Sequence, residues 1–245
     1  MLKQYYLTVA EGKRLIAKAI AQDVRVLKAA KEHTLVITGG TTNGYIVEEL
    51  FKAFDLGAFD KSTFFRGIYK GPELAAQSEG RDVVIREGKL VEGMTIVDIE
   101  PELNTGDMIL KGGNAVNVPD GEAGVVIGNP KFGTMDPITR AVYGRRVKLI
   151  VPIGLEKRVD IPITELVDLV CDPEMPGTRL AFAPGEVYTE LDALETTGVD
   201  AYLIGGGGVG GFEGSVLIAV EGEADEVAAA DALVKSVKGE PKFGF

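Results

Sequence analysis

The amino-acid sequence predicts an α/β fold with a Rossmann-like, mixed or mostly parallel sheet, and three observations lead to this prediction. The segment Leu35 to Leu50 runs from apolar residues through Gly-Gly-Thr-Thr-Asn-Gly into a helical pattern, as half of a parallel βαβ unit does. Short β-rich runs recur after it, separated by glycine, proline and asparagine. Beyond Pro173 the periodicity is interrupted, so we expect an α/β domain over residues 1–172 and a smaller α+β lobe over residues 173–245.

Apolar residues at helical spacing predict the helices. One helix is expected from Gly12 to Glu32, where lysines separate the apolar positions. A second helix follows the glycine turn, and Thr41 or Thr42 could supply its N-cap hydroxyl. Two more are expected at 138–146, after a proline start signal, and at 223–237, where valines, leucine and alanine share one side.

Runs of β-branched and apolar residues predict the strands. The first strand is Thr34 to Thr38, and the later runs are Val83 to Ile85, Thr95 to Ile99, Met108 to Leu110, Val125 to Ile127 and Val147 to Ile153. Their spacing mixes hairpins with crossovers, which favours a mixed sheet. Residues Ala201 to Val220 are expected to form two strands joined by the glycine loop Gly205 to Gly214. That loop could cradle a phosphate, or it could be a hairpin tip without a binding role.

Composition limits the classes of function. The chain has 245 residues, 45% of them hydrophobic, so it can bury a sizeable core. Its 26 basic and 37 acidic residues give a formal charge of −11, which repels nucleic-acid phosphates. A single cysteine, Cys171, and a single histidine, His33, argue against a disulfide and against a Cys/His zinc site. We expect no metal and no cofactor, and any metal would need carboxylate ligands.

The first residues do not resemble a targeting sequence. Met1 to Glu11 contains only a short apolar stretch before polar residues, which is too short for a signal peptide or a membrane span. We therefore expect a cytoplasmic protein that does not bind membranes. The sequence is compatible with a homo-oligomer.

The glycine turn after the first strand is the first candidate binding site. Glycines let backbone N–H groups approach a ligand, and the N-terminus of the following helix carries about half a positive charge. Phosphate or carboxylate groups suit such a site. The alternative is a turn that serves only to connect strand and helix. The residues proposed to bind are Gly39, Gly40, Thr41, Thr42 and Asn43.

A second candidate segment, Ile96 to Asn117, places several carboxylates near Lys111. Carboxylates at strand ends beside a lysine suit proton abstraction next to a carbonyl, because the lysine neutralises the developing enolate. The alternative is a solvated acidic loop. The acids are Asp98, Glu100, Glu102 and Asp107, and the lysine is followed by a second turn of Gly112, Gly113 and Asn114.

Together, the two segments resemble ribose-5-phosphate isomerase type A. That family has a Gly-Thr-Gly-Ser-Thr turn after its first strand and an Asp-Gly-Ala-Asp-Glu stretch leading to Lys-Gly-Gly-Gly. Its fold is shared with glucosamine-6-phosphate deaminase, the CoA-transferases and the sugar-sensing domains of some bacterial repressors. The segment Lys148 to Pro162 also looks like the strand and lysine loop of the isomerases, so the resemblance touches most of Leu35 to Pro162.

The resemblance implies roles for individual residues. Gly39 to Asn43 would form the phosphate loop, Asp98 would match the first aspartate of the second motif, and Lys111 would match the lysine before the glycines. Two positions depart from the family. The second aspartate falls on Pro101, and the family's catalytic glutamate falls near Asp120, a shorter acid in a Pro-Asp-Gly turn.

Three functions stay open at this point. The first is an enzyme that transfers a proton on a phosphorylated sugar or a related small carbonyl compound, with Asp98 or Asp120 as base and Lys111 as its electrostatic partner. The second is a phosphosugar-binding or sensor protein that does not catalyse, as Pro101 suggests. The third is a CoA-linked transferase, which would need a nucleophilic glutamate. In each case the expected partner is a small anionic ligand.

Overall fold

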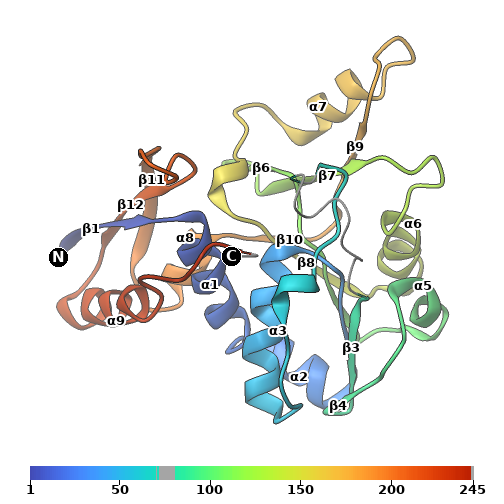
Figure 1. The fold of residues 1–245 in the computed structure, drawn as a ribbon, viewed down its shortest axis with the longest axis horizontal. Helices are drawn as coiled ribbons and strands as arrows, with labels where there is room; N and C mark the ends of the chain where they lie inside the picture. Colours follow the sequence, from blue (N-terminus) through green and yellow to red (C-terminus); the bar gives the residue numbers. More distant parts are fainter. Residues whose placement is uncertain (70, 72–80, 244–245) are drawn as a thin grey trace.

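The computed structural model describes residues 1–69, 71 and 81–243, and it has a mixed α/β architecture that contains parallel strands (Figure 1). A six-stranded sheet forms its centre, in the order β10-β8-β5-β2-β3-β4. The strands are Thr34–Ile37 (β2), Val83–Arg86 (β3), Lys89–Leu90 (β4), Met108–Leu110 (β5), Lys148–Pro152 (β8) and Glu186–Tyr188 (β10). The predicted mixed sheet is thereby confirmed.

Strand direction decides which loops meet. Strands β2, β5, β8 and β10 are parallel to one another, so their carboxyl ends lie at one edge of the sheet. Strand β3 is antiparallel to β2, with Val83 paired to Ile37, so the beginning of β3 lies at the same edge. Segments next to five strands, β2, β3, β5, β8 and β10, therefore meet at this edge.

Both faces of the six-stranded sheet are buried. Leu35 and Ile37 of β2 pack in one apolar cluster, and Val36 between them packs in another, as the alternation of side chains along a strand requires. The first cluster includes helices Val9–Ile20 (α1), Val24–Glu32 (α2), Thr41–Phe54 (α3) and Glu190–Glu195 (α8). The second includes the short helices Ile96–Ile99 (α5) and Met135–Thr139 (α6).

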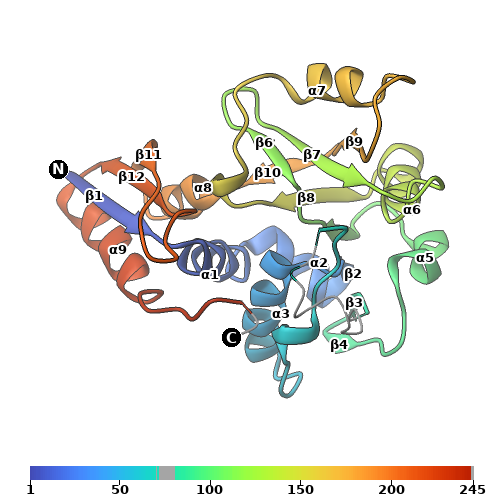
Figure 2. The same cartoon turned by 45° about the horizontal axis from the view of Figure 1, so that its top comes forward.

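Two smaller antiparallel sheets flank this centre (Figure 2). One has the order β1-β12-β11 and packs with helix α9; its elements are Leu2–Leu7 (β1), Asp200–Gly206 (β11), Val216–Glu221 (β12) and Ala224–Lys235 (α9). The other has the order β6-β7-β9 and is covered by helix α7; its elements are Ala115–Asn117 (β6), Glu122–Ile127 (β7), Ile163–Val170 (α7) and Arg179–Phe182 (β9). The predicted strand pair within 201–220 is confirmed by β11 and β12.

In two of the sheets, strands that precede residue 172 pair with strands that follow it. Strand β9 pairs with β7, and strand β10 pairs with β8, so segments from both sides of this position share sheets. The division into residues 1–172 and 173–245 stays a prediction.

The single helix expected from Gly12 to Glu32 is wrong, because the structure contains two helices there. Helix α1 ends at Ile20, and helix α2 begins after Asp23. The carboxylate of Asp23 accepts the backbone N–H of Arg25 at 2.7 Å and so caps a new helix. Continuous apolar spacing hid this break, since both helices bury residues against the same cluster.

The strand expected at Thr95 to Ile99 is also wrong. The segment forms helix α5, in which the Asp98 carboxylate accepts the backbone N–H of Thr95 at 2.9 Å in a capping box. Local capping outweighs the β propensity of Thr-Ile-Val. The helix expected at 138–146 is instead α6 followed by a π-helical turn, Arg140–Gly144. Three single-turn 3-10 helices, Lys61–Thr63, Glu100–Glu102 and Leu155–Lys157, complete the assigned helical segments.

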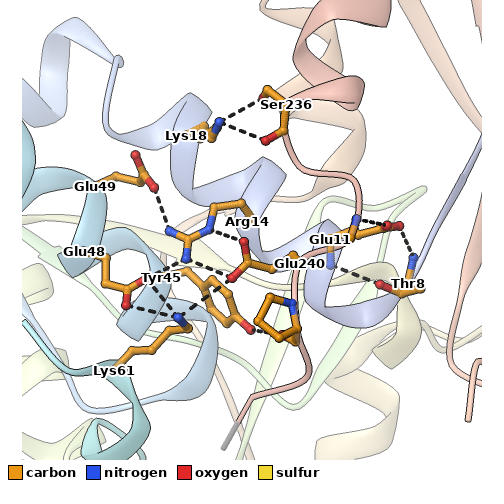
Figure 3. Close-up of polar contacts among 12 residues, drawn as sticks. Thr8, Glu11, Arg14, Lys18, Tyr45, Glu48, Glu49, Lys61, Ser236 and Glu240 are labelled. Carbon is orange, nitrogen blue, oxygen red and sulfur yellow. Dashed lines mark hydrogen bonds and ion pairs between the residues drawn. The ribbon is translucent and has the colours of Figure 1, made fainter. Parts of the chain in front are cut away.

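A buried arginine, Arg14 of α1, joins three segments of the chain (Figure 3). Its guanidinium lies 2.5 Å from Glu48 and 2.6 Å from Glu49, both on α3, and 2.9 Å from Glu240. It also lies over the ring of Tyr45, 4.7 Å from the centroid. Glu240 belongs to the C-terminal segment, residues 236–243, which these contacts hold against α1 and α3.

Removing this arginine should destabilise the protein strongly. In Arg14→Met three carboxylates would be left close together without their shared cation, and we expect the free energy of unfolding to fall by about 3 kcal/mol. Lys52→Met is the matched control, because exposed Lys52 pairs with the same Glu49 at 3.2 Å. It should cost less than about 0.5 kcal/mol. Urea denaturation measures both values, and equal losses would contradict the role given to Arg14.

Candidate functional site

A cavity of about 800 Å³ lies where the carboxyl ends of β2 and β5 meet the beginning of β3. The turn after β2 and the turn after β5 both line it, and these are the two turns that the sequence singled out. The predicted residues found in its lining are Gly39, Gly40, Thr41, Thr42, Asn43, Lys111, Gly112, Gly113 and Asn114. The structure thus brings together all of the predicted ligand-binding residues.

The N-terminus of helix α3 opens into this cavity without a side-chain cap. The expected cap by Thr41 or Thr42 is wrong, because the N-cap residue is Gly40, which has no side chain to accept a hydrogen bond. The first N–H groups of an α-helix have no partner within the helix. The hydroxyl of Thr42 also lacks a hydrogen-bond partner in the described part of the chain, although the residue is 97% buried, with 3% exposed. Several hydrogen-bond donors are therefore available to an anion here.

Asn43 fixes the position of this turn. Its side-chain amide donates to the carbonyl oxygen of Thr38 at 2.8 Å and to that of Leu110 at 3.1 Å. These two carbonyls lie just after β2 and at the end of β5, so the amide ties the two strand ends together. Asn43 supports the cavity wall by these bonds.

Asp82 is the carboxylate in the cavity that the sequence analysis missed. It is buried at the beginning of β3 and accepts the backbone N–H groups of Gly39 and Ile96, each at 2.9 Å. Its Oδ1 atom also lies 3.2 Å from the guanidinium of Arg66. Asp82 therefore holds the glycine turn, the start of α5 and Arg66 around one point.

Lys111 follows β5 and is half-buried in the cavity. Its ammonium donates to the carbonyl oxygen of Gly112 at 2.9 Å. Burial, together with the neighbouring charges of Arg66 and Lys157, lowers its pKa to about 8, and Asp82 acts in the opposite direction. A lysine with this pKa can hold or release a proton near neutral pH.

Basic side chains outnumber acidic ones among the described residues of the lining. Lys157 lies after β8 and donates to the carbonyl oxygen of Gly113 at 3.1 Å, and Lys131 lies at the exposed rim. With Arg66 and Lys111 they make four basic groups, against the carboxylate of Asp82 alone. An uncapped helix N-terminus and this charge balance both favour an anionic ligand.

The predicted catalytic aspartates lie elsewhere. Asp98 caps α5 through Thr95 and is not part of the cavity lining, and Asp120 is exposed in the turn between β6 and β7. The other acids of the second segment have structural partners. Glu100 pairs with Arg140 and Arg145, Glu102 pairs with Arg86, and Asp107 accepts the backbone N–H groups of Thr34 and Asn104.

Comparison with known proteins finds no matching protein family, no similar curated protein and no similar solved structure. The resemblance to the sugar-phosphate isomerases therefore stays a prediction based on motifs. No helix in the described part of the chain has both the length and the apolar character needed to cross a bilayer. Across residues 1–69, 71 and 81–243, no His, Cys, Asp and Glu side chains gather in a group of three that could hold a metal ion.

The two glycines of the second turn should respond differently to alanine. At Gly113 a Cβ atom would lie 2.8 Å from Ile153 Cδ1 and 3.3 Å from the carbonyl oxygen of Gly124, whereas at Gly112 its nearest neighbour would be the carbonyl oxygen of Pro152 at 3.8 Å. We expect Gly113→Ala to lower the free energy of unfolding by about 1–3 kcal/mol through overpacking. Gly112→Ala should be nearly neutral. Thermal denaturation of both variants tests this, and equal stability would contradict the tight packing at Gly113.

Proposed function

We propose that this protein binds a small phosphorylated compound, a phosphosugar or a related carbonyl compound, with its phosphate at the N-terminus of α3. The observation that carries this proposal is the uncapped first turn of α3, which opens into a cavity lined by basic side chains. Backbone N–H groups and the helix dipole together suit phosphate. The chain as a whole has a formal charge of −11, so the positive charge of the cavity is a local feature, opposite in sign to the net charge of the protein.

The proposed fold type agrees with this site. Sheet order β10-β8-β5-β2 with ligand at the carboxyl ends is the arrangement of a Rossmann-like sheet, and it supports membership in the sugar-phosphate isomerase and CoA-transferase superfamily. The chain runs from β2 to β3 and β4 on one side, and then returns to β5 on the other side of β2, so the direction in which strands are added reverses at β2. Ligands of open α/β sheets bind at such points.

In this proposal Lys111, rather than Asp98 or Asp120, transfers the proton. As a neutral amine, Lys111 would take the proton from the carbon next to the carbonyl, and the ammonium formed in this step would stabilise the enolate. Its pKa of about 8 lets it accept and release that proton near neutral pH. Asp82 acts as a positioning residue, because backbone N–H groups occupy both of its oxygens.

A binding protein without catalysis is the second candidate. It is favoured by one observation: among the described residues of the lining, the carboxylate of Asp82 is already engaged, and no other carboxylate faces the ligand. A CoA-linked transferase would need a glutamate at the site, and the described lining contains none.

Calorimetric titration with ribose 5-phosphate tests the binding proposal. We expect binding to the wild-type protein. In Lys111→Ala the affinity should fall by about tenfold or more, since a charge-assisted hydrogen bond is lost. Lys28→Ala, which removes an exposed lysine from α2, controls for the change in net charge and should bind normally. Ribose without the phosphate should not bind. Equal affinity of the wild type and Lys111→Ala would contradict the proposed site.

Proton exchange separates the enzyme from the binding protein. A proton-transferring enzyme would exchange the hydrogen next to the carbonyl of ribose 5-phosphate with deuterium from solvent, which NMR detects. We expect this exchange with the wild type and not with Lys111→Ala. Binding without exchange in the wild type would support the binding protein instead.

Phosphosugar affinity should depend on pH through Lys111. Because its pKa is lowered to about 8, the lysine is charged below that pH and loses its charge above it. The second ionisation of a phosphate monoester, with a pKa of about 6, is complete by then. We therefore expect the phosphosugar affinity to be highest below about pH 8. Above that pH the affinity should fall, and the fall should approach about tenfold for each pH unit.

The matched control for this pH dependence is Lys111→Met. It should bind more weakly at neutral pH and show a flat profile across the same range, measured by calorimetry. A fall of the same size in Lys111→Met would assign the titration to another group.

A further inference from the structure

A second cavity, of about 400 Å³, shares none of its described lining residues with the first. It is enclosed by the beginning of α1, the loop between β11 and β12, and the C-terminal segment. These three segments are far apart in the sequence, and Arg14 of α1 binds the C-terminal segment through Glu240 (Figure 3). The cavity is therefore a product of the tertiary fold.

The glycine loop of this cavity is packed into place. The hydroxyl of Tyr6 donates to the carbonyl oxygen of Gly207 at 3.2 Å, and its ring stacks on Phe212 with centroids 6.5 Å apart. Gly211 has φ 91°, and a Cβ atom there would collide with the ammonium of Lys242. Glycine at this position lets the lysine approach the loop backbone, so the segment is more than a hairpin tip.

Polar groups without partners face this cavity. Ser215 lines it, is only 2% exposed, and its hydroxyl has no hydrogen bond among the described residues. Lys13 and Lys242 also line it, and neither makes a hydrogen bond or ion pair within residues 1–69, 71 and 81–243. The buried hydroxyl and the two lysines are donors without acceptors, and an anion in the cavity would supply the acceptor atoms.

Carboxylates also lie near these lysines. Glu240 lines the cavity, but Arg14 binds it at 2.9 and 3.0 Å. Burial lowers the pKa of Lys13, and the charges of Glu156 and Glu190 act in the opposite direction. Glu213 of the glycine loop interacts electrostatically with Lys242. Within the described residues none of these carboxylates forms an ion pair with Lys13 or Lys242, so a phosphate can still bind both lysines directly.

Aromatic side chains line the remaining wall. Tyr45, Phe212 and Phe243 all contribute, and the rings of Tyr45 and Phe243 lie 6.4 Å apart at 49°. Flat apolar surfaces of this kind favour a planar ring in the ligand. The volume is that of a small organic molecule.

We propose that this second cavity binds a small organic phosphate that carries a planar ring, of the size of a nucleoside monophosphate. The phosphate accepts from Lys13, Lys242 and the Ser215 hydroxyl, beside the glycine loop. The ring lies against the aromatic wall of Tyr45 and Phe243. This site is separate from the α3 cavity and does not depend on the function proposed for that cavity.

Calorimetric titration with AMP, phenyl phosphate, inorganic phosphate and adenosine tests this site, in the wild type and in Lys111→Ala. The Lys111→Ala background removes an anion-binding group of the first cavity. We expect AMP to bind at millimolar concentration or below in both proteins, with inorganic phosphate and adenosine each weaker than AMP. Binding of AMP that disappears in Lys111→Ala would place it in the first cavity and overturn the proposal.

Single substitutions then identify the groups that bind. Lys13→Ala and Lys242→Ala should each lower the affinity for AMP by about tenfold or more, and Ser215→Ala should lower it by a smaller factor. Phe243→Ala should lower the affinities for AMP and phenyl phosphate but leave the affinity for inorganic phosphate unchanged. Lys28→Ala is the control for net charge and should bind AMP normally.

Two results would overturn the proposal. One is the absence of binding for AMP, phenyl phosphate and phosphate at millimolar concentration. The other is AMP binding that is unchanged in Lys242→Ala. That variant is decisive even if Lys13→Ala fails to fold, because Lys242 is exposed and its removal leaves the core intact. Circular dichroism establishes the fold of each variant.

Discussion

Parallel pairing of β2, β5 and β8 is the constraint on which the candidate site depends. Parallel strands must all end at one edge, and the segments that follow them here carry the uncapped helix, Lys111 and Lys157. Because β3 runs the other way, its beginning brings Asp82 to the same edge. Strand direction thus brings the uncapped helix, Lys111, Lys157 and Asp82 to one edge of the sheet.

Local patterns in the sequence predicted that the two turns and Lys111 belong to the site. Glycines and a lysine directly after an apolar run indicate the end of a strand, and this signal does not depend on where the strand lies in the sheet. Asp82 could not be found in this way. It stands directly before Val83 and so at the start of a strand, and only the antiparallel direction of β3 makes that start part of the site. The segment around Asp98 was expected to be a strand, because the prediction from its β-branched residues did not take account of the capping box that Thr95 and Asp98 form.

The distribution of acids explains how so acidic a chain can present positive cavities. Glu48, Glu49 and Glu240 share Arg14, Glu100 holds two arginines, and Asp82 holds backbone N–H groups. Structural contacts therefore neutralise these carboxylates. Among the described residues, the lysines of the two cavities form no ion pair with a carboxylate, and Lys111 and Lys157 donate to backbone carbonyl oxygens, so their charge is available to a ligand.

The pairing of β1 with β12 has a consequence for biosynthesis. Leu2 pairs with Glu221, so strand β1 must wait for β12, which is made much later. At about 5–20 residues per second the wait is on the order of 10–40 s. Closing so long a loop costs about 3 kcal/mol more than closing the β11–β12 hairpin. Throughout that interval Tyr5 and Leu7, which are buried in the finished fold, lack the strand that pairs with β1, so the nascent chain exposes an aggregation-prone edge until β12 has been made.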